Sequence, residues 1–388
     1  MTVCKILHII TTLCSGGAEA MLYKLITNWS DSKAQDCSFE HCIVSLTGPG
    51  IYGPKLKASG IQVYCLNMER SIFDLRKFVT LYSFIRKYRP HILQTWLYHS
   101  DLIGLASGGL ARVPNIVWNV RCSYMDFKHY SFGTRMIFAL LSKLSFVPDA
   151  VVVNSEAGKQ FHIKKGYRPR LWEVIPNGFD TDIFKPDASA GSRLRQFLGI
   201  DSPVQIIGMV ARFDPMKDHA NFFAAARIVS DFYPDVRFVL VGRGITEQNI
   251  ELMKMIRENS MNNRTYLLGE RTDIQDIVPG FDICTLSSSF GEGFPNVLGE
   301  AMSCGVPCVA TDVGDSAFII ADAGKVVPPG NAESLARAWL DMLLLSQQQR
   351  AELGRKARKR VENNFSVLKA VNRYERLYLE LLSERHVR

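Results

Sequence analysis

The strongest constraint on the fold of this chain is a regular alternation of short apolar runs with amphipathic stretches of helical length. In the first half, apolar runs at 5–10, 41–46, 63–66, 92–96, 116–120 and 150–154 alternate with helix-like stretches at 18–29, 75–87, 100–110 and 132–146. Runs that are apolar on both faces are typical of strands in a parallel sheet covered by helices on both sides. The pattern therefore predicts an α/β fold.

The alternation breaks between about residues 180 and 192, where Asp, Pro, Gly, Ser and Ala predominate, and then resumes. The chain of 388 residues is long enough for two domains, each with its own core. We therefore predict two doubly wound, Rossmann-like domains, residues 1–185 and 186–365, that face each other across a cleft. We expect a last helix, within 366–388, to pack back on the first domain.

Composition excludes several classes of protein. Hydrophobic residues make up 47% and charged residues 22%, which is ordinary for a globular protein and excludes wholesale disorder. No stretch is long and apolar enough to predict a membrane-spanning helix, and the N-terminus reads directly as a strand rather than as a signal peptide.

Nine scattered cysteines fit reduced thiols, so we expect a cytoplasmic location. Cys37, His41 and Cys42 have no second ligand pair at zinc-finger spacing, so we expect no metal site.

Positive charge is concentrated in the first half of the chain. Residues 1–188 contain 22 Lys and Arg against 14 Asp and Glu, whereas residues 189–388 contain 24 of each. A basic half indicates an anionic partner, and nucleic acid, an anionic membrane surface and a phosphorylated substrate all qualify. A surface charge that serves only solubility explains the same numbers.

Two loops that follow predicted strands have residues suited to phosphate groups. Gly16 and Gly17 precede a helix and allow backbone N–H groups to approach an anion. Because the G-x-G-x-x-G fingerprint is absent there, a dinucleotide-dependent dehydrogenase is disfavoured. Arg212 and Lys217 flank the turn after the strand at 205–211, where they can converge on a diphosphate, although exposed loop cations would look the same.

The most informative segment is Ser287–Met302. Pro295 is expected in the first turn of a helix, whose N-terminal N–H groups and partial positive charge would favour an anion. Glu292 precedes this helix and Glu300 lies within it, eight residues later. Carboxylates accept hydrogen bonds from sugar hydroxyls, so the segment suits a ligand that combines an anion with sugars.

This segment resembles the E-x7-E motif of the retaining GT-B glycosyltransferases of family 4, a group that includes bacterial polysaccharide and lipopolysaccharide transferases. Further similarities lie at 15–17, 174–180 and 305–314, and in the positions of Arg212 and Lys217. The resemblance covers most of the second half of the chain and scattered points of the first.

The resemblance implies a role for each matched residue. Glu300 would bind the ribose of the nucleotide, and Glu292 would hold the donor sugar. Arg212 and Lys217 would neutralise the departing nucleoside diphosphate. The remaining donor-binding residues would be Gly16, Gly17, Gly269, Arg271, Gly293, Phe294, Asn296 and Val297. His99, which follows the strand at 92–96, would lie near the reacting centre.

The implied activity is a metal-independent hexosyl transfer from a nucleotide sugar, with UDP favoured, to a glycan or lipid-linked glycan of the cell surface. No cofactor and no nucleic acid partner are expected. Peripheral contact with the inner membrane face is expected through basic residues such as Lys87, Arg89 and Lys128 and apolar ones such as Phe127, Tyr130 and Phe132.

A nucleotide-sugar epimerase and a non-catalytic binding subunit remain alternatives. Asp180-Thr181-Asp182 mimics the metal-binding D-x-D of another transferase fold, but its place in the linker predicts a turn.

Overall fold

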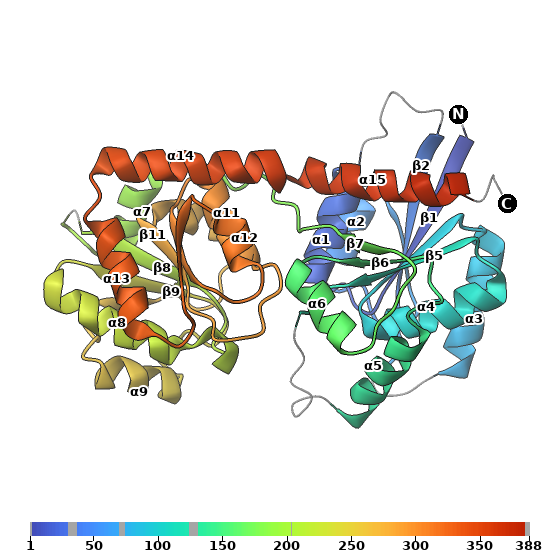
Figure 1. The fold of residues 1–388 in the computed structure, drawn as a ribbon, viewed down its shortest axis with the longest axis horizontal. Coiled ribbons are helices and arrows are strands. Elements are labelled where there is room, and N and C mark those ends of the chain that lie inside the picture. The colour runs from blue at the N-terminus through green and yellow to red at the C-terminus, as the bar shows by residue number, and fades with distance from the viewer. Residues whose placement is uncertain (1, 30–36, 70–73, 124–130, 203, 385–388) are drawn as a thin grey trace. The chain divides into compact units, whose positions relative to one another are not determined.

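The computed structural model describes residues 2–29, 37–69, 74–123, 131–202 and 204–384 (Figure 1). The chain forms two compact units. The first is made of residues Met1–Gly178 together with Val367–Arg388, and the second is the continuous segment Phe179–Ser366. The first unit is therefore built from two pieces of the chain that are far apart in sequence.

The first unit contains a seven-stranded parallel sheet with the order β3-β2-β1-β4-β5-β6-β7. Its strands are β1 (Thr2–Ile10), β2 (Cys37–Ser45), β3 (Gln62–Cys65), β4 (Ile92–Trp96), β5 (Asn115–Val120), β6 (Ala150–Val153) and β7 (Trp172–Val174). The strand order reverses direction between β1 and β4, which are hydrogen-bonded neighbours. In sheets of this type, ligands bind beyond the carboxyl ends of the strands at that reversal.

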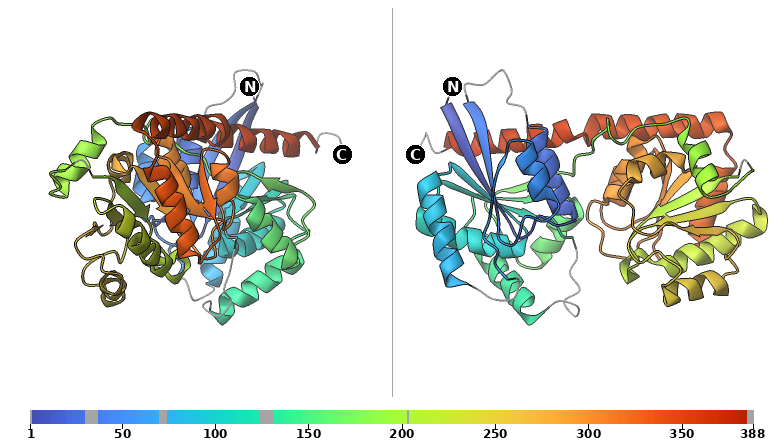
Figure 2. Two further views of the ribbon diagram at one scale, coloured as in Figure 1. Left: turned by 60° about the vertical axis from the view of Figure 1, so that its left-hand side comes forward. Right: turned by 180° about the vertical axis from the view of Figure 1, so that it is seen from behind.

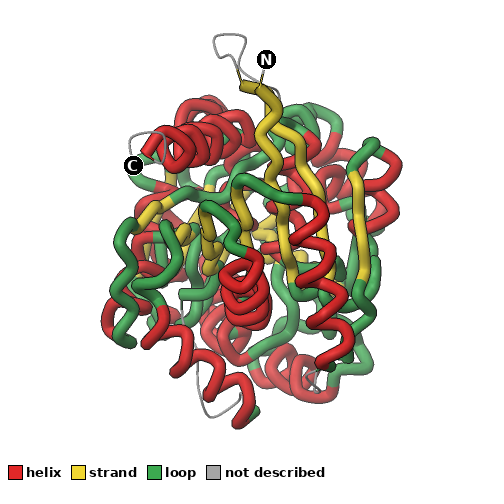
Figure 3. The backbone as a smooth tube through the Cα atoms, turned by 90° about the vertical axis from the view of Figure 1, so that its right-hand side faces the viewer, coloured by secondary structure: helices red, strands yellow, loops and turns green. Residues whose placement is uncertain are grey.

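Helices cover both faces of this sheet, as Figure 3 shows. One face packs against α1 (Gly17–Thr27), α2 (Tyr52–Ala58) and α15 (Val367–Glu384). The other packs against α3 (Leu75–Tyr88), α4 (Tyr98–Ala111), α5 (Phe132–Leu144) and α6 (Glu156–Lys164). The central strands β1, β4, β5 and β6 therefore lie between two apolar layers, which explains why their sequences are apolar on both faces.

The second unit repeats this plan with six parallel strands in the order β10-β9-β8-β11-β12-β13. They are β8 (Ile206–Val210), β9 (Arg237–Val241), β10 (Thr265–Leu267), β11 (Ile283–Leu286), β12 (Cys308–Thr311) and β13 (Gly324–Val327). Here the order reverses between β8 and β11. The loops that follow β8 and β11 are therefore the expected ligand-binding loops of this unit.

Two helical layers also cover the second sheet, seen from further directions in Figure 2. One layer contains α7 (Ala190–Phe197), α11 (Asn296–Ser303), α12 (Ser316–Ile320) and α14 (Gln347–Asn364). The other contains α8 (His219–Phe232), α9 (Ile250–Glu258) and α13 (Ala332–Leu343). The short helices η2 (Pro215–Lys217), α10 (Ile274–Ile277) and η3 (Val278–Gly280) lie in the connections.

The boundary between the units lies at Gly178 and Phe179, not after residue 185 as expected. Phe179 forms a β-bridge with Ser366, and its N–H donates to the carbonyl oxygen of Phe365 over 2.8 Å. The Phe179 ring lies against Gly299 and stacks on Phe294 in the second core. This packing assigns the segment after Gly178 to the second unit.

The last helix, α15, belongs to the core of the first unit, where Tyr374 and Tyr378 are fully buried. The two parallel sheets confirm the predicted α/β class of two Rossmann-like domains.

The D-x-D segment is a turn, as predicted, in which the Asp180 carboxylate accepts from the N–H groups of Asp182 and Ile183. Among the described residues, no helix combines the length and the apolar composition required to cross a bilayer.

Candidate active site

The loop after β8 contains the two predicted phosphate-binding cations, in different environments. Asp214 caps η2 by accepting from the N–H of Met216 over 3.0 Å, and its Oδ2 lies 2.8 Å from Nε of Arg212. Burial raises the pKa of Asp214, but these hydrogen bonds outweigh it and hold the pKa below its usual value. The Arg212 side chain is 48% exposed, whereas that of Lys217 is only 13% exposed.

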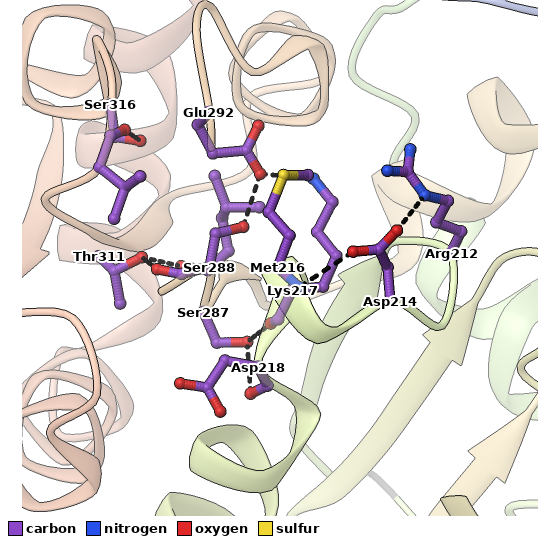
Figure 4. A network of polar contacts seen from close by, with 12 residues as sticks. Arg212, Asp214, Met216, Lys217, Asp218, Ser287, Ser288, Glu292, Thr311 and Ser316 are labelled. Atoms are coloured by element: carbon purple, nitrogen blue, oxygen red, sulfur yellow. Dashed lines mark hydrogen bonds and ion pairs between the residues drawn. The ribbon is translucent and has the colours of Figure 1, made fainter. Parts of the chain in front are cut away.

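Lys217 ends η2 and reaches the loop after β11 (Figure 4). Its Nζ lies 2.5 Å from Oε1 of Glu292, whose side chain is 8% exposed. The Ser288 hydroxyl donates to the same oxygen over 2.5 Å. Two predicted site residues, Lys217 and Glu292, are therefore in direct contact.

Hydrogen bonds from Ser287, Ser289 and Thr311 to backbone carbonyl oxygens join the loops that surround this ion pair. Ser287 Oγ donates to the carbonyl oxygen of Lys217 over 2.7 Å, and the N–H of Ser289 donates to that of Met216 over 3.0 Å. Thr311, at the end of β12, donates from Oγ1 to the carbonyl oxygen of Ser288 over 2.6 Å. These contacts hold the ends of β8, β11 and β12 together.

The turn that contains Glu292 and Gly293 is closed by the loop after β12. Gly314 has φ +62°, and a Cβ atom on it would lie 2.3 Å from the carbonyl oxygen of Glu292. The N–H of Asp315 donates to the carbonyl oxygen of Gly293 over 2.8 Å. Glycine is therefore required at 314 both by its left-handed conformation and by close packing.

The helix after this turn differs slightly from the prediction. Pro295 is the N-cap of α11, with ψ 112°, rather than a residue of its first turn, because helical backbone angles begin at Asn296. The side chain of Phe294 is buried and packs edge-on against Phe365. Only the backbone of Phe294 is therefore available to a ligand at this turn. Asn296 and Val297 form the first turn, and the partly buried Glu300 lies one turn further on.

Gly269 and Arg271 follow β10, beside the loop that follows β9. The N–H of Gly242 donates to Gly269 over 2.7 Å, and Gly269 has φ +65°. Arg271 makes two parallel hydrogen bonds to Asp273, of 2.8 and 2.6 Å, and its guanidinium lies 5.5 Å from the ring centre of Phe197. A planar side chain held in this way is oriented to stack or to donate in one direction.

The remaining predicted residues lie in the first unit, beyond its strand-order reversal. Gly16 is the N-cap of α1, and a Cβ atom on it would lie 2.3 Å from the Glu19 carboxylate, so a side chain there would displace that of Glu19. Gly17 is the first residue of the helix. His99 lies in the first turn of α4 behind Leu97, which has φ +75° and ψ 152°. Strained backbone of this kind is concentrated at functional sites.

Sequence reasoning missed three polar residues around Lys217. Asp214 accepts from the N–H of Lys217 through its carbonyl oxygen, and Ser288 donates to the same carboxylate oxygen as Lys217. The run Ser287–Ser289 directly after a buried strand was the available signal. The third is His219, which is almost fully buried and whose Nε2 has no hydrogen-bond partner among the described residues. Burial, together with the charge of Lys217, lowers the pKa of His219 to about 4.

Comparison with known proteins matches each half of the chain to a glycosyltransferase family model. Residues 15–183 match the family described as Glycosyltransferase Family 4, and residues 204–344 match Glycosyl transferases group 1. A galactosyltransferase of Escherichia coli that uses UDP-Gal and α-D-GlcNAc-diphosphoundecaprenol is 25% identical over 338 residues, 84% of each chain. A Campylobacter jejuni N-acetylgalactosaminyltransferase that acts on N,N'-diacetylbacillosaminyl-diphospho-undecaprenol is 25% identical over 79% of this chain and 82% of its own.

Solved structures show the same fold. Anabaena Alr3699/HepE in complex with UDP superposes with a TM-score of 0.83 at 23% identity, covering 97% of this chain and all of the other. Sucrose-phosphate synthase from Thermosynechococcus elongatus superposes with a TM-score of 0.76 at 19% identity, covering 98% of this chain and all of the other.

Proposed function

Because the chain belongs to the family 4 glycosyltransferases of GT-B fold, we propose that it transfers a hexose from a nucleoside-diphosphate sugar, with UDP favoured, to a glycan or lipid-linked glycan. The transfer retains the anomeric configuration and requires no metal ion. The observation that carries this proposal is the contact of Lys217 with Glu292 beside the N-terminus of α11. It supports a site with a cation for the diphosphate and a carboxylate for the sugar in one place.

The charges suit the reaction. Cleavage of a glycosyl–phosphate bond leaves negative charge on the diphosphate, so cations fixed beforehand stabilise the transition state. Lys217 is fixed by its buried partner, whereas the half-exposed Arg212 can exchange Asp214 for a phosphate. The positive end of α11 adds to this field.

The other donor contacts follow from the family pattern. Glu300 accepts from the ribose hydroxyls, and the turn of residues 293–297 donates its backbone N–H groups to the donor. Gly269 and Arg271 lie near the base. In the first unit, Gly16 and Gly17 contribute backbone N–H groups, and His99 acts near the reacting carbon. We assign no protein group as general base, because the departing phosphate removes the acceptor proton from the same face.

The acceptor side of the proposal is a lipid-linked or anionic glycan at an anionic membrane surface. Both bacterial relatives described above have names that specify diphosphoundecaprenol acceptors. The helices α3, α4 and α5 contain one carboxylate, Asp101, which is fully buried and whose pKa is raised by burial. Their exposed charges are therefore all positive.

Apolar side chains accompany these charges on α5. Phe132, Met136 and Leu140 are 72, 56 and 44% exposed and recur every four residues, which is one stripe of a helix. Arg135 and Lys143 on the same helix are exposed. Exposed apolar residues beside cations are typical of helices that lie at a membrane interface. Phe127, Lys128 and Tyr130, which we also expected at this surface, lie outside the described residues.

A panel of nucleotide sugars without acceptor tests the function. Slow release of free sugar and nucleotide is expected for the UDP-sugar donor, and addition of a polyprenyl-diphosphate glycan should convert it to a product with the donor's anomeric configuration by NMR. Activity should persist in EDTA. Interconversion of donor sugars would indicate an epimerase, and lack of turnover across the panel would indicate a binding subunit. Activity restored only by added manganese or magnesium would overturn the metal-free mechanism.

A further inference from the structure

We propose that Ser288 is a positioning residue of the transfer reaction: by donating to Oε1 of Glu292, it leaves Oε2 as the oxygen that accepts from hydroxyl groups of the donor sugar. This inference rests on the proposed function. It concerns how one carboxylate serves two partners, the catalytic cation and the sugar.

The two oxygens of Glu292 have different surroundings. Lys217 Nζ and Ser288 Oγ both lie 2.5 Å from Oε1. No described residue donates to Oε2, and Figure 4 shows both dashed contacts meeting at the other oxygen. Each carboxylate oxygen accepts about two hydrogen bonds, so Oε1 is saturated while Oε2 retains capacity for two hydroxyl groups.

Ser288 can fix this orientation because it is itself held from both sides. It is fully buried two residues after the end of β11, and its carbonyl oxygen accepts from Thr311. The neighbouring Ser287 binds the backbone of Lys217. A carboxylate can only accept, so the Ser288 hydroxyl must donate to Glu292. One dipeptide thus holds the backbone of the lysine and the carboxylate of the glutamate.

Loss of the Ser288 hydroxyl should leave Lys217 as the only described donor to Glu292. The carboxylate could then rotate around its contact with the ammonium group and present either oxygen to the sugar. Because misplaced groups lose catalytic power without losing ligand contacts, we expect about a tenfold decrease in kcat/KM for the UDP-sugar donor. Affinity for free UDP should not change, because the nucleotide does not contact Glu292 in the proposed site.

A double-mutant cycle tests this role. Ser288→Ala and Glu292→Gln are measured singly and together, with kcat and KM for the donor and calorimetric affinity for UDP. If Ser288 acts through Glu292, the double variant should be no slower than Glu292→Gln alone. The matched control is Ser316→Ala, which also removes a fully buried hydroxyl, one that donates to the carbonyl oxygen of Val313 over 2.7 Å. Its kcat/KM should stay within twofold of wild type, and its effect should add to that of Glu292→Gln.

The outcomes separate this inference from the proposed function. Full transfer activity in Glu292→Gln would overturn the assigned role of Glu292 itself. A loss in Glu292→Gln, with Ser288→Ala either harmless or fully additive, would overturn only the positioning role. If Ser288→Ala does not fold, Ser288→Cys replaces it in the cycle. Its weak donor should give activity between wild type and Glu292→Gln, and additivity there would again overturn the positioning role.

Discussion

Lys217 and Glu292 are 75 positions apart in the sequence, yet Nζ of the lysine lies 2.5 Å from Oε1 of the glutamate. Each neutralises a charge that would otherwise be nearly buried without a partner. Removal of one member of such a pair costs more than the pair contributes, because the other charge remains in the interior. Substitutions here should therefore affect stability as well as catalysis.

Lys217→Ala should reduce kcat by about 100-fold, because the diphosphate loses a preorganised cation. It should also lower the free energy of unfolding by about 3 kcal/mol, because Glu292 stays buried and unpaired. The double variant Lys217→Ala with Glu292→Gln should recover part of the stability but none of the activity. Urea unfolding and donor hydrolysis measure the two effects separately. Unchanged stability in the single variant would contradict the buried ion pair.

Glu300→Ala should weaken binding of both UDP and the UDP-sugar by about 1–3 kcal/mol, because ribose hydroxyls lose their acceptor. Isothermal titration calorimetry measures this directly. Glu333→Ala is a suitable control, since Glu333 is an acidic residue in the first turn of another helix, α13. Equal affinities of wild type and Glu300→Ala for both ligands would rule out the ribose role.

Gly314→Ala and Gly330→Ala form a matched pair. Both glycines have φ near +60°, but a Cβ atom at 330 meets nothing within 4 Å, whereas at 314 it meets the Glu292 backbone. Gly330→Ala should cost about 1–2 kcal/mol of unfolding free energy from backbone strain alone, with normal turnover. Gly314→Ala should cost more and also slow transfer, because the turn that holds Glu292 must move. Identical effects of the two substitutions on kcat would refute that coupling.

Stability should decrease as the pH falls below about 6.5. Burial lowers the pKa of His41 to about 3 and that of His162 to about 4, and places that of His8 well below its usual value. The native protein therefore keeps these imidazoles neutral while the unfolded chain takes up protons below the ordinary pKa, which favours unfolding by about 2 kcal/mol per imidazole at pH 5.

Urea unfolding at pH 7.5 and pH 5.0 measures this loss. His162→Gln removes one titrating group. The decrease in its unfolding free energy between the two pH values should therefore be smaller than that of wild type by the contribution of one imidazole, about 2 kcal/mol. A variant with an unchanged pH dependence would show that His162 is already protonated in the native state.

Vesicle sedimentation tests the proposed binding of the protein to an anionic membrane surface. The protein should bind vesicles that contain anionic lipid and not neutral ones, since each basic residue near an anionic leaflet contributes about 1 kcal/mol. Added salt should weaken binding, as should Lys87→Glu and Arg89→Glu. Lys254→Glu reverses an exposed charge on α9 of the second unit and should have no effect. Equal sedimentation with both vesicle types would contradict the proposal.

Sequence periodicity was sufficient to predict both parallel sheets apart from the short edge strand β7, because strands buried on both faces and the helices between them have distinct patterns. It failed at Phe179, since the partner of that residue, Ser366, is about half the length of the chain away. The linker composition of residues 180–192 obscured the boundary, because polar turn residues also occur in segments that pack well.

The sequence nominated individual residues for the candidate site, but it could not predict their contacts. The E-x7-E motif places Glu292 before a helix, yet nothing local indicates that Lys217 will be its partner. For His41, the neighbours in sequence are a poor guide to the partner in space. Cys42 is next to it in sequence but points to the opposite face of β2, and Cys37 lies four residues away along the strand. Nδ1 of His41 instead lies 2.9 Å from Nε2 of His8.

The division of the first unit into two chain segments has a consequence for synthesis on the ribosome. The seven strands of its sheet emerge first, but α15, with the buried Tyr374 and Tyr378, emerges only after the whole second unit. The second unit is continuous and can complete its core while the first still exposes the apolar face that α15 will cover. Domains usually complete folding from the N-terminus onward during translation. In this protein the order should be reversed, and the nascent first unit is the part that would depend on chaperones.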